Sequence, residues 1–211
     1  MFMNVEASRH HHKEALRSGI LEAARAIFVR DGFDGFSMRT LARSVGYSPA
    51  SLYLHFKSKD ELFDVLVEES FADLYRSLEK IVREKGKDPM QQLKRGLRLY
   101  VDWGLKNPNE YQIAFVIRTP ATKPYQTHQA FEAARTLVKL ALAGTGTTPR
   151  ESELRTQAVW AAVHGITSLL TQRPQFPWVS KKRLIDHVID SAIRGVIGAR
   201  KQERSARSCK Q

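Results

Sequence analysis

The segment SPASLYLHFKSKDEL, residues 48–62, contains two helix-start signals ten positions apart. Ser48 can cap one helix, with Pro49 at the first helical position, where the missing proline N–H leaves no hydrogen bond unmade. Ser58 can cap the next helix, and Glu61 three residues later completes a capping box. The first of two helices that start this close together has to be short. The segment therefore predicts a short helix, a sharp break and a new helix.

Helical periodicity recurs through the rest of the chain, without β-type alternation and without an internal repeat. One apolar stripe runs from Leu16 to Phe28 and is followed by Gly32, a residue suited to a helix C-terminus. Further start signals stand at Ser37, Asp88, Asn107, Thr148 and Ser180. We expect an all-α fold of about nine helices and no strands, with short helices before residue 60 and longer ones after it. The polar residues 1–12 and those after Arg200 should be loose.

Two short helices joined by the sequence GYS have the layout of a helix-turn-helix unit. On a helical wheel, Leu52 and Phe56 face inward, with Ser48 and Pro49 near them. The outward face carries Ala50, Leu54 and Lys57, flanked on opposite sides by Ser51 and Tyr53. Small or hydrogen-bonding residues stand at its start and a cation at its end. Such a helix suits the DNA major groove, which it would enter with its N-terminal residues first.

Leu54 is the residue that best separates a DNA-reading face from an ordinary solvated surface. It faces away from the core of a three-helix unit, where water contact is unfavourable unless a base methyl group or a sugar covers it. His55 leans inward and is expected mainly to pack. Taken one residue at a time, the alternative stays open that Tyr53, His55 and Phe56 form only a small core.

Phosphate contacts are expected on both sides of this helix. The Tyr53 hydroxyl can reach a phosphate, and the helix start at Ser58 presents backbone N–H groups beside Lys59. A second group of contacts, to the opposite strand, is offered by Ser37, Arg39 and Thr40. As an alternative, Lys57 and Lys59 are merely solvated.

The charge distribution favours an anionic partner. The chain has 211 residues, a net charge of +12 and a pI of about 10. No acid occurs between Asp34 and Asp60, and residues 173–211 carry ten Lys or Arg against three Asp or Glu. No apolar run is long enough to span a bilayer, the N-terminus lacks a signal-peptide core, and the lone Cys209 allows no intrachain disulfide. We expect a cytoplasmic protein without a membrane partner.

Residues 20–63 resemble the N-terminal domain of the TetR family of transcriptional regulators. The features that carry the resemblance are the Ala-Ala pair and Phe28 of the first helix, Gly32–Phe33, Thr40–Leu41–Ala42, Val45–Gly46 and Leu52-Tyr53-x-His55-Phe56-x-Ser58-Lys59-x-x-Leu62. The resemblance implies a dimeric repressor that binds a palindromic double-stranded DNA operator and is released by a small-molecule effector. It also implies phosphate contacts by Thr40, Tyr53 and Lys59, and base contacts by residues 48–51 and Leu54. The expected domains are a DNA-binding domain at 1–63, an effector-binding and dimerisation domain at 64–199 and a basic tail at 200–211.

The second domain resembles the family more loosely, through WAAVHG at residues 160–165, which is similar to a Trp-x-x-x-His-Gly signature of one C-terminal subgroup. An effector pocket needs apolar walls with a few polar groups. The candidates are Trp103, Tyr111, Phe115, Phe131, Trp160 and His164. Two stripes of mostly small residues predict a dimer interface of two helices from each subunit. Their members are Ala158, Ala161, Ala162, Gly165 and Leu169, and Leu184, Val188, Ala192, Gly195 and Val196.

Two other functions stay open on the sequence alone. The basic tail could give sequence-nonspecific DNA binding, and a helical hydrolase could use His164, although no nucleophile accompanies it. We expect no enzyme, because neither a phosphate-binding glycine loop nor a nucleophile elbow occurs. We also expect no cofactor and no metal, although the run His10-His11-His12 is a lone group of metal-binding side chains.

Overall fold

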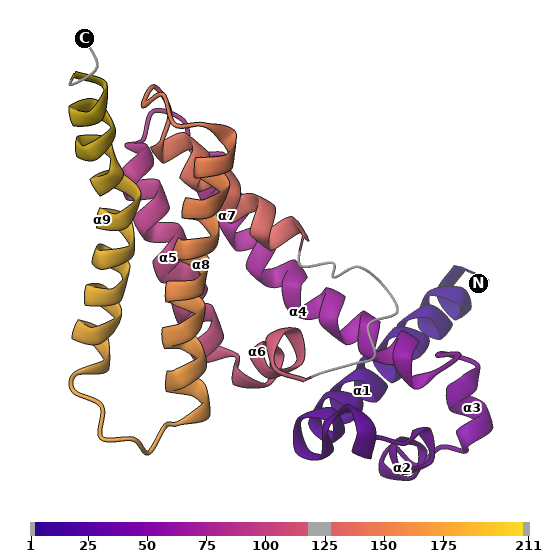
Figure 1. The fold of residues 1–211 in the computed structure, drawn as a ribbon. Helices are drawn as coiled ribbons and strands as arrows, with labels where there is room; N and C mark the ends of the chain where they lie inside the picture. The colour runs from indigo at the N-terminus through magenta and orange to yellow at the C-terminus, as the bar shows by residue number, and fades with distance from the viewer. Residues whose placement is uncertain (1–2, 118–127, 209–211) are drawn as a thin grey trace. The chain divides into compact units, whose positions relative to one another are not determined.

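The computed structural model describes the backbone of residues 3–117 and 128–208, and the side chains of residues 14–117 and 129–196. Within these residues the regular structure consists of nine α-helices without a strand (Figure 1), so the predicted all-α fold is confirmed. The helices are α1 (Met3–Gly35), α2 (Met38–Ser44), α3 (Pro49–Tyr53), α4 (Lys59–Val82), α5 (Pro89–Lys106), α6 (Pro108–Phe115), α7 (His128–Ala141), α8 (Pro149–Gln172) and α9 (Lys181–Ser208).

Most helix starts coincide with the capping residues that the sequence indicates. The hydroxyl groups of Ser37, Ser48 and Thr148 each accept a hydrogen bond from the backbone N–H three residues on. The Asp88 carboxylate caps α5 in the same way, by accepting from the N–H of Met90. Asn107 closes α5 at the other end, since its side-chain amide donates to the carbonyl of Trp103.

The two chain ends differ from expectation. Helix α1 already begins at Met3, and α9 continues to Ser208, so the segments predicted to be loose are helical wherever the structure describes them. Gly32 interrupts α1 with φ 73° and ψ −179°, a conformation that glycine adopts without strain. The predicted helix end at Gly32 therefore exists as a kink, which one further turn follows.

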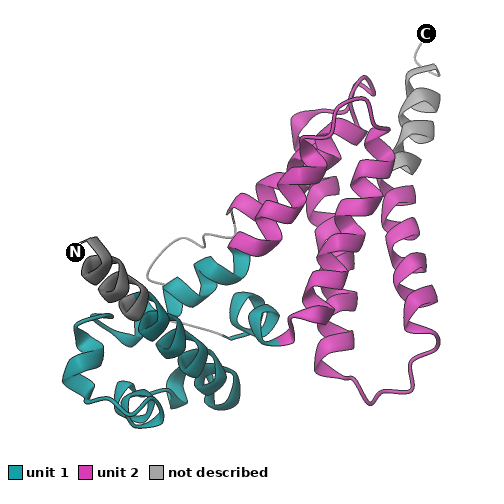
Figure 2. Ribbon diagram, turned by 180° about the vertical axis from the view of Figure 1, so that it is seen from behind, with its two compact units in different colours: residues 1–71, 109–124 teal, residues 72–108, 125–211 magenta. Residues whose placement is uncertain are grey.

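The chain divides into two compact units (Figure 2), one of residues Met1–Phe71 and Asn109–Pro124 and the other of Ala72–Pro108 and Tyr125–Gln211. The first unit contains α1, α2, α3, the start of α4, and α6. The second contains the rest of α4 with α5, α7, α8 and α9. The sequence places a domain boundary near residue 63 and gives no sign that α6 belongs to the first unit.

Aromatic side chains form much of the first unit's core. Phe28 stacks on Phe36 with ring centroids 3.9 Å apart, and the edge of Phe63 meets both Phe28 and Phe33. Ile113 of α6 is buried in the same cluster. The core extends from α1 to α6 and holds the short helices α2 and α3 through buried leucines.

Polar bonds reinforce the packing of α6 within this unit. The Arg25 side chain of α1, only 11% exposed, donates to the Ser70 hydroxyl of α4 and pairs with Glu69 and with Glu110 of α6. The Gln112 amide also donates to the carbonyl of Val29. Arg25 thus joins three helices, a role that depends on contacts far apart in sequence.

The second unit is a bundle whose helices are joined by both close packing and ion pairs. Gly96 of α5 faces Leu137 of α7 at a distance that leaves no room for a side chain. Between α5 and α9, Lys94 pairs with Asp190, and Arg98 lies 2.8 Å from Asp186. The hydrogen bond from Lys94 lowers the pKa of the Asp190 carboxyl below its usual value.

Candidate nucleic-acid interface

The turn between α2 and α3 is built around Gly46. Gly46 has a φ of 73°, which ends α2. The N–H of the following Tyr47 donates a hydrogen bond to the carbonyl oxygen of Ala42, with 2.9 Å between nitrogen and oxygen. Helix α3 is then anchored by Leu52 and Phe56, which are 0% and 1% exposed. These two positions agree with the helical wheel, and they fix which side of the short helix faces outward.

The outward side carries the residues that the sequence analysis assigns to DNA. Leu54 is 85% exposed and Tyr53 is 51% exposed, and Ala50 and Lys57 are exposed as well. His55 and Ser51 are half-buried. Ser48 and Pro49, expected near the inward residues, are exposed, because they lie at the helix start, before its first complete turn.

Two hydroxyl pairs stand at the starts of α2 and α3. The Ser37 and Thr40 hydroxyl oxygens are 2.8 Å apart, and the Ser48 and Ser51 oxygens are also 2.8 Å apart. In each pair the first oxygen also accepts the backbone N–H of the second residue. Because one hydroxyl hydrogen lies between the two oxygens, each pair keeps a single O–H to donate outward.

Cations without an acidic partner surround α3. Among the side chains that the structure describes, Arg39, Arg43 and Lys57 are exposed and form no ion pair. By contrast, Arg95 and Arg98 of the second unit are each bonded to carboxylates. Unpaired cations in an acid-free stretch provide a positive potential that attracts phosphate groups. Arg43 was not among the predicted contacts, although its place in that stretch is a signal for it.

Lys59 differs from the other cations. Its Nζ donates a hydrogen bond to the carbonyl oxygen of Phe33, 3.3 Å away, and lies 4.4 Å from the centre of the Phe33 ring. The ammonium group therefore joins the start of α4 to the end of α1. Beside it, half of the predicted capping box is present, because the Ser58 hydroxyl accepts the N–H of Glu61. The Glu61 carboxylate accepts the N–H of Lys57, one residue before the Ser58 N–H that a capping box would use.

Sequence reasoning missed two further residues near α3. Tyr47, the residue after Gly46, is exposed in the turn between α2 and α3. Arg17 of α1 lies with its guanidinium carbon 5.1 Å from the centre of the Phe56 ring, and so supports the inward anchor of α3. No local pattern reveals this contact, because the two residues are 39 positions apart.

The predicted effector residues fall into two clusters, one in each unit. In the second unit, the Trp160 ring contacts both Phe131 and His164, and the Tyr100 hydroxyl lies 3.0 Å from Nδ1 of His164. Burial lowers the pKa of His164, so its imidazole is neutral at pH 7. Trp103 lies on α5 of the same unit.

The other two predicted effector residues, Tyr111 and Phe115, belong to the first unit. Their ring centroids are 5.0 Å apart, and Phe115 meets Phe71 edge to face at 5.1 Å. Tyr111 is buried. Both rings pack with neighbours of that unit.

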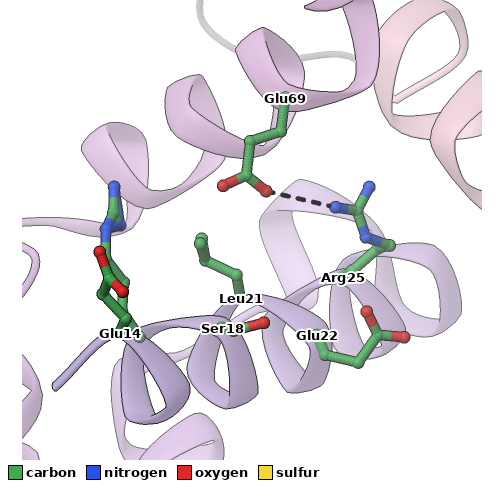
Figure 3. A pocket seen from close by; sticks show the side chains of 7 residues that line it. Glu14, Ser18, Leu21, Glu22, Arg25 and Glu69 are labelled. Carbon is green, nitrogen blue, oxygen red and sulfur yellow. Dashed lines mark ion pairs between the residues drawn. The ribbon is translucent and has the colours of Figure 1, made fainter. Parts of the chain in front are cut away.

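A hollow of about 230 Å³ lies between α1 and α4 in the first unit (Figure 3). Its walls are mostly charged: Glu14, Arg17, Ser18, Leu21, Glu22, Arg25 and Glu69. Opposed charges and a single leucine differ from the apolar lining that a small-molecule site requires. We therefore do not assign the effector to this hollow.

The residues predicted to form the dimer interface lie on α8 and α9. Ala158, Ala161, Leu169 and Gly195 are exposed, and Ala162, Gly165, Leu184, Val188 and Ala192 are half-buried. Side chains added at Gly165 or Gly195 would meet nothing within 4 Å. Val196 differs from the others, because it is 1% exposed and packs in the bundle core of its own chain.

Two models from one protein family match the chain. The one described as "Bacterial regulatory proteins, tetR family" matches residues 20–66, and the one described as "Tetracyclin repressor-like, C-terminal domain" matches residues 93–193. The chain belongs to the TetR family. It is therefore a DNA-binding transcriptional regulator with an N-terminal helix-turn-helix and a ligand-binding C-terminal domain. The resemblance noted in the sequence is confirmed.

Individual relatives agree with this assignment. The uncharacterized HTH-type transcriptional regulator YfiR of Bacillus subtilis (strain 168) is 35% identical over 69 residues, which span 33% of this chain and 34% of that protein. A TetR-like transcriptional regulator from Rhodococcus sp. RHA1 shares the fold with a TM-score of 0.65 at 21% identity, over 87% of this chain and 96% of its own. A TetR variant from Acinetobacter baumannii AYE, solved in complex with minocycline, has the same fold with a TM-score of 0.60 at 22% identity. The match covers 86% of this chain and 96% of that one.

No described helix of this TetR-family chain combines the length and the apolar character needed to cross a bilayer. The side chains of His10, His11, His12 and Cys209 and of the basic tail lie outside the described residues.

Proposed function

We propose that the protein is a dimeric repressor that binds a palindromic operator through α3 and leaves it when a small-molecule effector binds. The observation that carries the proposal is the outward face of α3, where a leucine and a tyrosine are exposed between cations that have no acidic partner. An exposed leucine on a short, rigidly anchored helix suits a groove that covers it. The positive surroundings suit the phosphates on either side.

Salt titration on specific and random DNA tests the operator-binding part of this proposal. DNA fragments are selected with the purified full-length protein, and affinity for a selected fragment is compared with that for scrambled DNA over a range of salt concentrations. We expect the selected fragment to bind at least about 10³-fold more tightly. Equal affinity for both would favour the alternative of nonspecific binding through the basic tail.

Lys57 should contribute one phosphate contact. It is exposed and forms no ion pair among the described side chains, so Lys57→Ala leaves folding unaffected. Each phosphate neutralised contributes about 0.9 to the slope of log K against log salt concentration. We expect the variant to bind specific and random DNA more weakly by the same factor and to lose about one unit of slope. Lys139→Ala, which removes an exposed cation from α7, is the control and should keep the full slope.

Dimer formation is supported by apolar surface on α8. Leu154 and Leu169 of α8 are 60% and 50% exposed. Leu169 is among the predicted interface residues and lies one helical turn after Gly165, where an added side chain would meet nothing within 4 Å. Exposed leucines and close-approach glycines on one pair of helices suit a second copy of the chain, packed about a two-fold axis.

Effector control is proposed for the cluster of Phe131, Trp160 and His164. A ligand changes operator affinity only if it binds two conformations unequally. Two reading heads about 34–36 Å apart must enter successive major grooves. We expect an effector, identified by screening for release of DNA, to weaken binding to the full palindrome far more than binding to one half-site. Equal weakening of both would indicate direct competition at α3.

Trp160→Ala tests where the effector binds. The substitution should change the effector response while leaving effector-free operator binding within about twofold, because Trp160 is partly exposed and remote in sequence from α3. A thermal melt distinguishes this from unfolding. An unchanged effector response in a folded variant would remove this cluster from the proposal.

A further inference from the structure

The face that α3 presents lacks most of the side chains that read bases by paired hydrogen bonds. Residues 48–57 contain no Arg, Asn, Gln, Asp or Glu. In the major groove, Arg recognises guanine and Asn and Gln recognise adenine through such bonds, while Asp and Glu accept a hydrogen bond from the cytosine amino group. The long donors in the segment are Tyr53, whose hydroxyl is expected to contact a phosphate, and Lys57, which lies beyond the end of α3. Sequence discrimination by α3 must therefore depend mainly on other groups.

The remaining hydrogen-bonding groups near the start of α3 discriminate poorly. Ser48 and Ser51 bond to each other, and Ser48 also accepts a backbone N–H, so together they keep one O–H to offer. A lone hydroxyl can donate to or accept from several base edges and gives little preference among them. The half-buried His55 is partly withdrawn from the surface.

Apolar groups are what the outward face does offer. Ala50 lies in the first turn of α3. Leu54 is the C-cap residue of the same helix, and 85% of the leucine's surface is exposed. Four residues apart, they lie on the same side of the helix. The thymine 5-methyl group is the apolar feature of the major groove, and apolar side chains are its ordinary contacts.

We propose that the protein recognises its operator mainly through thymine methyl groups, which Ala50 and Leu54 contact. This inference rests on the proposed operator binding and adds the chemical class of base that α3 reads. Each half-site then contains A·T pairs whose thymines place their methyl groups against α3. Burying one methyl group accounts for about fourfold in affinity, and two such contacts in each half-site multiply this effect over the palindrome.

Replacing thymine with deoxyuridine tests the proposal, because uracil lacks only the methyl group. An operator is first selected and footprinted with the full-length protein. Each thymine is then replaced in turn, and affinity is measured. We expect one or two positions in each half-site to lose about fourfold each, with the other positions unaffected.

The same DNA series is then measured with Leu54→Ala. The variant should bind the thymine operator more weakly and should no longer distinguish thymine from uracil at the position that Leu54 contacts. Val179→Ala truncates another exposed apolar side chain, 72% exposed and outside α3, and should keep the full thymine preference. Thermal melts establish that both variants are folded.

The outcomes separate this inference from the function on which it rests. If no DNA fragment is selected over random DNA, the proposed function itself fails. If an operator is bound specifically but every deoxyuridine substitution changes affinity by less than twofold, thymine-methyl recognition is overturned and hydrogen bonds or DNA shape must supply the specificity. A thymine preference that persists in full in Leu54→Ala would also overturn it, since the methyl groups would then act without that side chain.

Discussion

Replacing Gly96 with alanine should destabilise the second unit by about 1–3 kcal/mol, the usual effect of adding a methyl group to a packed core. A Cβ at this position would overlap Cδ1 of Leu137 and lie 3.7 Å from Cδ2 of Leu78. Leu137 is 2% exposed, so its side chain can move aside only by displacing its packed neighbours. Either the Leu137 side chain or the two helices α5 and α7 would have to shift. The free energy of unfolding, measured in urea, gives the loss directly.

Gly19→Ala is the matched control for this prediction. Gly19 also lies within a helix, but a side chain there meets nothing within 4 Å. Alanine favours helix over glycine, so this variant should gain up to about 1 kcal/mol. In the double variant Gly96→Ala/Leu137→Ala, the total loss should be smaller than the sum of the two single losses, because the clashing group is gone. A Gly96→Ala protein as stable as wild type would show that α5 and α7 are less closely packed.

Gly195→Glu should convert the protein to monomers and abolish tight operator binding. Gly195 is exposed on α9 with open space around it, so a glutamate is tolerated in a single chain. In a two-fold interface the same carboxylate would be buried without a partner, a penalty on the order of 3 kcal/mol for each subunit. That amounts to about a hundredfold loss in dimer affinity for each glutamate. Sedimentation velocity measures the association state.

Two further measurements make the dimer prediction decisive. Leu169→Glu on α8 should have the same effect, whereas Gln175→Glu, which makes the same charge change at an exposed loop position, should leave the dimer intact. The monomers should still melt cooperatively, which separates dissociation from unfolding. A Gly195→Glu protein that remains dimeric would place the interface away from this part of α9.

Local signals in the sequence were sufficient to predict the architecture around α3. Ser37 and Ser48 cap the helices they were expected to cap, and Leu52 and Phe56 are the inward anchors. These features depend on residues within one turn of each other, where capping bonds and helix periodicity decide the structure. The exposed position of Leu54 was predictable for the same reason, because helix periodicity places it on the side of α3 away from the buried Leu52.

Features that depend on long-range contacts were not predictable. Arg25 joins α1, α4 and α6 through partners up to 85 positions away, and nothing nearby marks it as different from other arginines. The membership of α6 in the first unit has the same origin. The Lys59 ammonium group bonds to the carbonyl of Phe33, 26 positions earlier, whereas the sequence predicted a phosphate contact or a solvated side chain.

A footprint on DNA flanking the protein's own gene, made with wild type and Leu54→Glu side by side, tests the central claim most directly. Leu54 is 85% exposed, so the glutamate leaves the fold intact while placing a carboxylate where α3 faces DNA. We expect wild type to protect a palindromic site, Gln175→Glu to protect the same site, and Leu54→Glu to protect none at the same concentration. A Leu54→Glu protein that gives the wild-type footprint would contradict the assignment of α3 as the reading helix.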